Sequence, residues 1–449
     1  MLNKAVERER QLDANRAIAQ KIRNRLQQLK NATPIDKQRW IWELLQNAKD
    51  TVSVEEKVDI EIIITNEYLD FSHNGGFFTA RNITNLVHQI SSKEGTDSTG
   101  RFGTGFLTTH TLSRLIQVKS ILFDEEKNEC SNFSILLSRE GSEEEEFIEG
   151  IQKTWDSFTS RKIDKPQRCK TIFRYLSPHK EIALGALKNF EEAILFNLAF
   201  VEKLGKITIQ NDIENNKVTF CLKDKKQLSK NICLYSFMAG DSERLLLKLS
   251  DNDIDICIEV SKKDNSYIFE PISEKLARIF CDFPLIGTED FFFPLILNSR
   301  KFSPKTERDK LYLNGDGDDA INNKQLIEQA TTLYAKLLDF TTQNNFKDFY
   351  IIAQHELPPK NDDFDQSWYK KHIQSKIRDF LLEYPIVESE KNELKYILKS
   401  NDENEIAGIW FPHANEKKNR EFIWNKTFAL YNVPLCQDHL IKYSYSSNL

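Results

Sequence analysis

The chain has 449 residues, which predicts two to four domains, and its 29% charged and 40% hydrophobic residues are typical of a folded protein rather than a disordered one. The formal net charge of -6 gives no overall nucleic-acid footprint, so we interpret the short basic stretches 161–170 and 223–230 as solvated surface. The seven cysteines include no Cys-x-x-Cys pair, which favours reduced thiols. The N-terminus is too charged for a signal peptide, and no apolar run is long enough to predict a membrane span. We therefore expect a cytoplasmic protein without a membrane partner.

The first predicted element is a helix over residues 2–30 with one narrow apolar stripe, spaced by three or four residues. Such a stripe must dock either on this chain or on a partner. After a break, Thr33 with Asp36 three residues later predicts a capping arrangement for a second helix that ends at about Thr51. The stripe consists of Ile18, Ile22, Leu26 and Leu29.

The next stretch predicts alternating strands and short helices, and we interpret its acidic run Glu143–Glu146 as an exposed loop. From residue 205 to 300 the pattern is rich in strands, and the last hundred residues are mostly helical. The predicted strands lie at 58–65, 69–73, 115–123, 133–137, 170–176 and 384–388, and the predicted helices at 79–90, from 104, at 180–204 and at 319–342.

Three polar residues share one face of the second helix. In WIWELLQNAKD, Glu43, Asn47 and Asp50 lie at i, i+4 and i+7. One interpretation is a solvated helix face. The other is functional: Glu43 orients and deprotonates a water molecule, and Asn47 offers an oxygen to Mg²⁺, which prefers oxygen ligands and offsets charge on a transferring phosphate.

A glycine-rich segment, SSKEGTDSTGRFGTGF (91–106), is predicted to open a helix. Glycines let backbone N–H groups approach phosphates, a helix N-terminus favours anions, and Lys93 and Arg101 add positive charge. The glycine spacing is neither that of a P-loop nor that of a Rossmann motif. Upstream, LDFSHNGGFF (69–78) ends in a glycine turn, which is either a plain strand turn or a place where a flat ligand approaches the backbone.

Together, in this order, the motifs resemble the nucleotide site of the GHKL superfamily (gyrase, heat-shock chaperone, histidine kinase, MutL). ELLQNAKD resembles its N-box, FSHNGG its first glycine motif and GRFGTGF its second, in a form close to that of the ninety-kilodalton heat-shock chaperones. Thr171, in CKTIFRYL, resembles the threonine on the adenine side. The match covers about residues 35–177 and implies ATP and Mg²⁺, the metal held by Asn47 and the water activated by Glu43. The implied nucleotide-binding residues are Asn47, Asp50, His73, Asn74, Gly75, Ser92, Lys93, Gly100, Arg101, Phe102, Gly103, Thr104, Gly105, Phe106 and Thr171.

A second resemblance lies downstream, in FPLIGTEDFFFPLILNSRKFSPKTERDKLYL (283–313). It is similar to the segment after the ATP domain of sacsin-like ATPases and to the catalytic loop of the chaperone middle domain. By that resemblance Arg300 reaches the γ-phosphate, with Lys301 and Arg308 as substitutes. A cation from a second domain would make hydrolysis depend on domain closure. A plain basic loop is the alternative.

The first glycine motif departs from the family pattern. The family's Asp accepts a hydrogen bond from the adenine amino group, and here His73 takes its place, followed by Asn74. A neutral His or an Asn carbonyl can also accept, whereas Asp70 points away if the residue after it is buried. The lid at about 87–99 is shorter than in the chaperones, and its Ser-Ser-Lys resembles that of sacsin-like, MORC and type VI topoisomerase ATPases, which implies that Lys93 contacts a phosphate.

The resemblance implies an α/β (α+β) chain in three regions. These are a GHKL (Bergerat) α/β sandwich ATP-binding domain at 1–180, a middle or transducer domain at 181–345, and a helix-rich C-terminal region at 346–449.

It further implies a slow ATPase that closes its lid, forms a homodimer on ATP binding and uses hydrolysis as a conformational switch. Because the apolar stripe of the N-terminal helix otherwise lacks a partner, we expect this helix to be exchanged between protomers. Standalone sacsin-like ATPases of bacteria are associated with antiviral defence, so we expect that role. Two alternatives remain, a chaperone acting on client proteins and a nucleotide-sensing scaffold that controls an effector protein. A nucleic-acid partner is left open.

Overall fold

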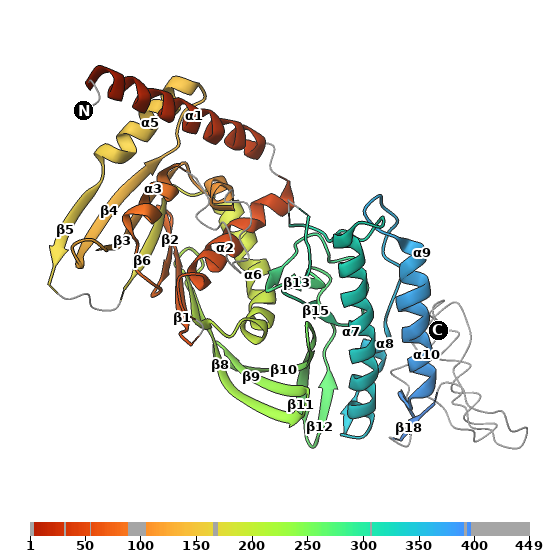
Figure 1. Ribbon diagram of the computed structural model, residues 1–449. Helices are drawn as coiled ribbons and strands as arrows, with labels where there is room; N and C mark the ends of the chain where they lie inside the picture. Colours follow the sequence, from red (N-terminus) through yellow and green to blue (C-terminus); the bar gives the residue numbers. More distant parts are fainter. Residues whose placement is uncertain are drawn as a thin grey trace, which may run out of the picture. The chain divides into compact units, whose positions relative to one another are not determined.

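The computed structural model describes residues 4–30, 33–53, 55–88, 105–164, 169–305, 308–389 and 393–396. The fold is mixed α/β, with a large mixed sheet and several helices (Figure 1). By compactness the chain divides into two units, the first covering residues 1–223 and 237–243 and the second 224–236 and 244–449. The boundaries of these two units differ from those of the three regions expected from the sequence, so the three-region division stays a prediction. None of the helices in the described ranges combines the length and the apolar character that a bilayer span requires.

The sheet of the first unit is built on β1, which pairs antiparallel with β2 on one side and parallel with β7 on the other. Along β1, Val58, Ile60 and Ile62 are buried and the residues between them are half-buried, because successive side chains of a strand point to opposite faces. The strand order is β8-β7-β1-β2-β6-β3-β4-β5. The bounds are β1 (Val58–Ile64), β2 (Tyr68–His73), β3 (Leu115–Asp124), β4 (Glu129–Ser138), β5 (Thr159–Ile163), β6 (Thr171–Leu176), β7 (Leu204–Asn211) and β8 (Asn216–Ser229).

The helix that carries the predicted N-box starts as the sequence predicts. Thr33 Oγ1 accepts a hydrogen bond from the Asp36 N–H at 3.2 Å, and the Asp36 carboxylate accepts one from the Thr33 N–H at 3.0 Å. This helix, α2, packs beside α6, where the Trp42 and Phe190 rings lie 4.7 Å apart. The bounds are α1 (Lys4–Lys30), α2 (Pro34–Lys49), α3 (Ala80–His88), α4 (Gly105–Thr108), the 3₁₀ turn η1 (Thr109–Thr111), α5 (Glu144–Asp156) and α6 (Lys180–Phe200).

The apolar stripe of α1 docks on its own chain. Ile22 and Leu26 are buried in one cluster with Phe147 and Ile151 of α5 and Leu107 of α4. Figure 1 shows α1 lying beside α5. The predicted exchange of this helix between protomers assumed a stripe without a partner, and that premise is wrong.

The acidic run 143–146 is not a loop, because it forms the start of α5. The Glu146 carboxylate accepts hydrogen bonds from the backbone N–H groups of Ser142 and Glu143 at 2.7 and 3.0 Å. Carboxylates near a helix N-terminus are favoured by the helix dipole. Behind them, Phe147 and Ile151 are buried, so the run opens an amphipathic helix.

The second unit has a sheet with the order β14-β13-β15-β11-β10-β9, and α7 packs on it through Leu326, Ile327 and Leu337. Strands β8, β9 and β10 have residues in both units. The predicted helix at 319–342 is α7, and residues 397–449 lie outside the described residues. The remaining bounds are β9 (Ile232–Ala239), β10 (Ser242–Asp251), β11 (Ile254–Lys263), β12 (Ser266–Phe269), β13 (Ile279–Cys281), β14 (Phe283–Pro284), β15 (Ile296–Asn298), α7 (Asp318–Thr342), β16 (Phe346–Lys347), α8 (Tyr350–Ala353), α9 (Gln366–Tyr369), the π-helical turn η2 (Lys370–Gln374), α10 (Ser375–Glu383), β17 (Val387–Glu388) and β18 (Leu394–Lys395).

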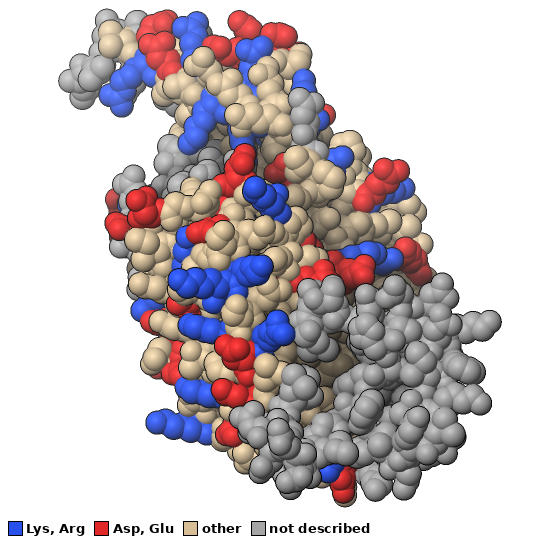
Figure 2. All heavy atoms as spheres, turned by 90° about the vertical axis from the view of Figure 1, so that its right-hand side faces the viewer, with Lys and Arg blue, Asp and Glu red and all other residues tan. Residues whose placement is uncertain are grey.

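The charged side chains are distributed as on an ordinary solvated surface. On the face that Figure 2 presents, Lys and Arg side chains lie among Asp and Glu side chains, so that face bears both signs of charge. The basic stretch 223–230 belongs largely to β8 and is mostly exposed, and Lys223 pairs with Glu243 at 2.8 Å. This exposure confirms the interpretation of 223–230 as solvated surface.

Candidate functional site

The predicted N-box stripe is half-buried on a helix that is otherwise buried. Within the segment from Trp40 to Asp50, Glu43, Asn47 and Asp50 are half-buried, and every other residue is buried. Their spacing places them on one face of α2. A solvated helix face would be exposed, so the stripe lies at a place where other parts of the chain enclose it.

The second glycine motif reaches this stripe at Gly105, the first residue of α4. A Cβ added at Gly105 would lie 2.0 Å from Oε2 of Glu43 and 2.7 Å from its Cδ. The backbone of α4 therefore approaches the carboxylate as closely as only glycine permits. The other carboxylate oxygen, Oε1, lies 3.5 Å from the guanidinium of Arg39 one helical turn earlier, so Glu43 is held between a cation and the start of α4.

The first glycine motif packs on the end of the same helix. A Cβ at Gly75 would lie 1.9 Å from the Thr51 hydroxyl, and one at Gly76 would lie 2.6 Å from the Thr51 carbonyl oxygen. Both contacts are far below van der Waals distance, which explains the glycine pair. Both glycine motifs thus meet α2, and segments that are apart in the sequence come together around Glu43, Asn47 and Asp50.

His73 and Thr171 face each other at the end of this assembly. They are opposite in the register of β2 and β6, and the Thr171 hydroxyl lies 2.6 Å from that of Ser120. The His73 ring stacks on Phe173 at 6.3 Å, and Phe173 contacts Phe106 of α4 at 5.7 Å. Predicted site residues of the base end and of the glycine helix therefore share one face of the sheet.

The tautomer of His73 follows from its surroundings. Burial lowers the pKa of His73 from 6.5 to about 4, so the ring is neutral at pH 7. The Gly75 N–H donates to Nδ1 at 3.1 Å, which makes Nδ1 the acceptor and leaves the proton on Nε2. His73 therefore presents a donor, whereas the sequence interpretation expected an acceptor.

The two other candidates for the base end are engaged elsewhere. Asn74 is exposed, and its side-chain oxygen accepts a hydrogen bond from the Asp59 N–H at 2.7 Å, so it fastens the turn to β1. Asp70 pairs with Arg174 at 2.7 Å on the other face of the strand, because Phe71 is fully buried, as the sequence predicts. Among these candidates, His73 alone faces Thr171.

Sequence reasoning missed a buried cation that lies beside the last turn of α3. Arg139, at the end of β4, is 1% exposed and donates to the Val87 carbonyl at 2.7 Å and to the Ser138 carbonyl at 2.9 Å. Burial lowers its pKa to about 10 and, with Arg139 nearby, the pKa of His110 to about 3. Arg139 thus binds the last turn of α3. No local sequence pattern marks it, since its partners come from a distant helix.

Arg300 belongs to the second unit, just after β15. Its Nε donates to the Asp282 carboxylate at 2.9 Å, and the Arg300 side chain is 65% exposed while that of Asp282 is 2% exposed. Lys301 pairs with Asp253 at 2.8 Å. The approach of Arg300 to a nucleotide stays a prediction.

Seven predicted site residues lie outside the described residues. Among the described residues, no group of three His, Cys, Asp or Glu is arranged as a metal site. Mg²⁺ held by one protein oxygen, water and phosphates does not need one. No family model and no curated protein matches the chain. The seven residues are Ser92, Lys93, Gly100, Arg101, Phe102, Gly103 and Thr104.

Proposed function

We propose that this chain is a GHKL-type ATPase that binds Mg-ATP beside α2 and hydrolyses it as a conformational switch. The observation that carries the proposal is the contact of Gly105 with the Glu43 carboxylate. It brings the start of a glycine-opened helix against a carboxylate on the stripe that also holds Asn47. Phosphate-binding backbone, a general base and a metal-binding oxygen are what hydrolysis of a nucleoside triphosphate requires.

The side chains divide the work by their chemistry. Glu43 takes a proton from the attacking water, and Arg39 at 3.5 Å holds the carboxylate in place. The half-buried Asn47 amide oxygen suits Mg²⁺, which would offset the charge of the phosphates when bound. His73 and Thr171 form the polar groups of the base end.

A second function is favoured by one contact. The Arg39 guanidinium lies 3.5 Å from the Glu43 carboxylate and competes with the water that the base must contact. A chain in which this pair persists would bind ATP and hardly hydrolyse it, as a nucleotide-sensing scaffold for an effector protein. Turnover numbers in Arg39→Gln separate the two, because release of Glu43 would speed hydrolysis only in the scaffold case.

The wider role is proposed on resemblance alone. By it the chain forms a homodimer on ATP binding, Arg300 completes the site from the second unit, and the switch serves antiviral defence in bacteria. A chaperone that acts on client proteins is the alternative role. Both uses share the same nucleotide site.

The test is equilibrium binding of ATP to the full chain with and without Mg²⁺. Asn47→Ala should weaken binding about tenfold or more in Mg²⁺ and leave metal-free binding unchanged, because only the metal contact is lost. The matched control is Lys37→Ala, an exposed position on the same helix, which should bind like wild type. Wild type that binds no adenine nucleotide would contradict the proposal.

A further inference from the structure

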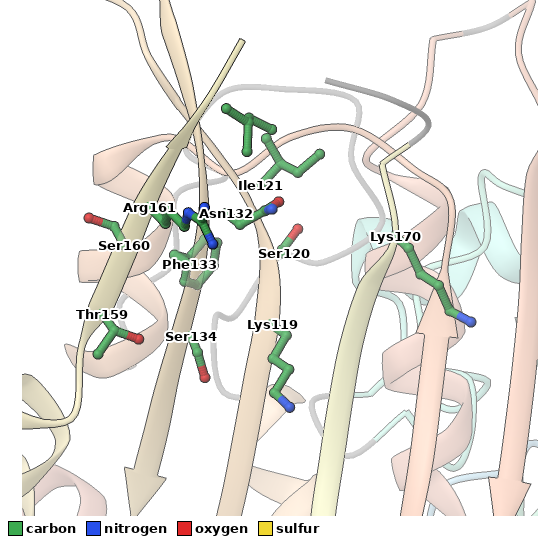
Figure 3. Close-up of a pocket in the computed structure, with 11 residues that line it drawn as sticks. Lys119, Ser120, Ile121, Asn132, Phe133, Ser134, Thr159, Ser160, Arg161 and Lys170 are labelled. Atoms are coloured by element: carbon green, nitrogen blue, oxygen red, sulfur yellow. The ribbon is translucent and has the colours of Figure 1, made fainter. Parts of the chain in front are cut away.

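A hollow of about 710 Å³ lies over strands β3, β4 and β5 of the first unit (Figure 3). This volume falls within the roughly 300–1,000 Å³ of small-molecule sites. β5 is the edge strand of the sheet and is exposed along nearly its whole length, so the hollow is open to solvent from that edge.

The strand register shows on which face of the sheet the polar and charged rows of the lining lie. Lys119, Ser134 and Thr159 are opposite one another on the three strands, and so are Ile121, Asn132 and Arg161 two residues further along. Residues directly opposite share a face. The row of Lys119 continues to Ile172 of β6, which neighbours Thr171 in sequence and so points the other way. The two rows therefore lie on the sheet face opposite to His73 and Thr171. The two rows are Lys119–Ser134–Thr159 and Ile121–Asn132–Arg161.

The charge of the hollow is positive. Its lining has three cations, and no described residue in the lining is Asp or Glu. Lys170 pairs with Glu61 at 3.0 Å, whereas Lys119 and Arg161 have no ion pair within the described part of the chain. Two uncompensated cations thus border a hollow in a protein whose net charge is -6. This local sign is opposite to that of the whole molecule.

The spacing of these two cations fits more than one anionic group. They are two strands and two residues apart, which places their Cα atoms roughly 12 Å from each other at ordinary strand dimensions. Figure 3 shows Arg161 reaching from the edge strand toward Asn132, with Lys119 to one side. The Asn132 amide and the Ser134 and Thr159 hydroxyls add neutral donors between the cations.

We propose that this hollow binds a ligand that carries phosphate groups, with Lys119 and Arg161 each holding one phosphate and Asn132 donating between them. Lysine contacts a phosphate as a point charge, and the arginine fork binds two of its oxygens. Lys119 and Arg161 lie on the sheet face opposite to that of Thr171, so the binding of phosphate by these two cations does not depend on ATP hydrolysis. The phosphates belong either to a small phosphorylated molecule or to a single-stranded nucleic acid.

The experiment measures binding of two probes to the full chain. Inorganic pyrophosphate is titrated by calorimetry, and a dye-labelled ten-residue oligodeoxythymidylate by fluorescence anisotropy at several salt concentrations. The double variant Lys119→Ala/Arg161→Ala should weaken at least one probe about tenfold or more per cation. The matched control is Lys162→Ala, since Lys162 is next to Arg161 in β5, points to the other face and pairs with Glu129 at 2.5 Å.

The outcomes separate the two sources of phosphate. Weakened pyrophosphate binding supports a small phosphorylated ligand. Weakened oligonucleotide binding alone, with a salt slope reduced by about 1.4 for two lost cations, supports the backbone of a nucleic acid. The proposal is overturned when wild type binds neither probe, when the double variant binds both as wild type does, or when Lys162→Ala weakens binding equally.

Discussion

One methyl group added at Gly105 perturbs the proposed catalytic base, Glu43. In Gly105→Ala the new Cβ would lie 2.0 Å from Oε2 of Glu43. Ordinary contact needs about 3.4 Å, so the carboxylate must withdraw by roughly 1.4 Å (3.4 − 2.0). The atoms that move are the end of a flexible side chain, so the fold should lose little stability, within about 1 kcal/mol.

The effect on turnover should be much larger. Displacing a catalytic group by about 1 Å costs on the order of a hundredfold in rate, and we expect a loss of that size in the magnesium-dependent ATPase. ATP binding should stay near that of wild type, because the three atoms nearest to the added methyl all belong to Glu43. Turnover and binding therefore separate in this variant.

The assay compares steady-state ATPase, ATP affinity and unfolding free energy. The matched control is Gly185→Ala in α6, where an added Cβ meets nothing within 4 Å. It should gain up to about 1 kcal/mol from helix propensity and keep full turnover. A Gly105→Ala enzyme that hydrolyses ATP like wild type would refute the role of Glu43.

Three further outcomes concern the base end. His73→Asp exchanges the Nε2 donor for an acceptor, whereas ITP carries an acceptor oxygen at position 6 where ATP carries an amino group. The preference for ATP over ITP should therefore rise about tenfold in competitive binding. An unchanged ratio of the two affinities would show that His73 does not face the base. Acid should destabilise wild type, because the pKa of His73 is about 4 in the folded chain and 6.5 in the unfolded chain. Between these two values the unfolded chain binds more protons than the folded chain. The unfolding free energy therefore falls by about 3 kcal/mol as pH drops through that window. Denaturant titrations should show a flatter pH dependence in His73→Gln, and an identical one would contradict the buried neutral ring. Thr171→Val should lower the unfolding free energy by about 1–2 kcal/mol, because it leaves the buried Ser120 hydroxyl with only the weak Cys169 thiol contact at 3.7 Å. Adding Ser120→Ala should recover part of this loss, and strictly additive losses would argue against the bond between Thr171 and Ser120.

Local patterns predicted the elements that local forces determine. The capping residues Thr33 and Asp36 fix the start of α2, and the apolar alternation of residues 58–64 gives β1. Periodicity also placed Glu43 and Asn47 on one helix face. In each case the interacting residues are within a few positions of one another, so the sequence window contains the whole interaction.

Contacts between distant segments were not predictable in the same way. The hydrogen bond from the Asp59 N–H to the Asn74 side chain depends on how β1 and β2 are paired. Because this bond occupies the Asn74 side-chain oxygen, Asn74 is not the acceptor that was expected at the base end of the site. The Nε2 proton of His73 depends on the backbone turn at Gly75. The interpretation of the acidic run 143–146 as a loop was wrong because packing on α1 stabilises the helix that the run begins. α1 lies about one hundred residues earlier in the chain, so no local pattern contains this contact.

The central claim is that Glu43 is the base of an ATPase site, and paired measurements on wild type and Glu43→Ala test it most directly. ATP binding and magnesium-dependent ATP turnover are measured on the same preparations, with the oligomeric state recorded alongside. The account predicts that wild type hydrolyses ATP, and that Glu43→Ala binds ATP as well but no longer turns it over. Undiminished hydrolysis in Glu43→Ala, or a wild type that binds no adenine nucleotide, would contradict it.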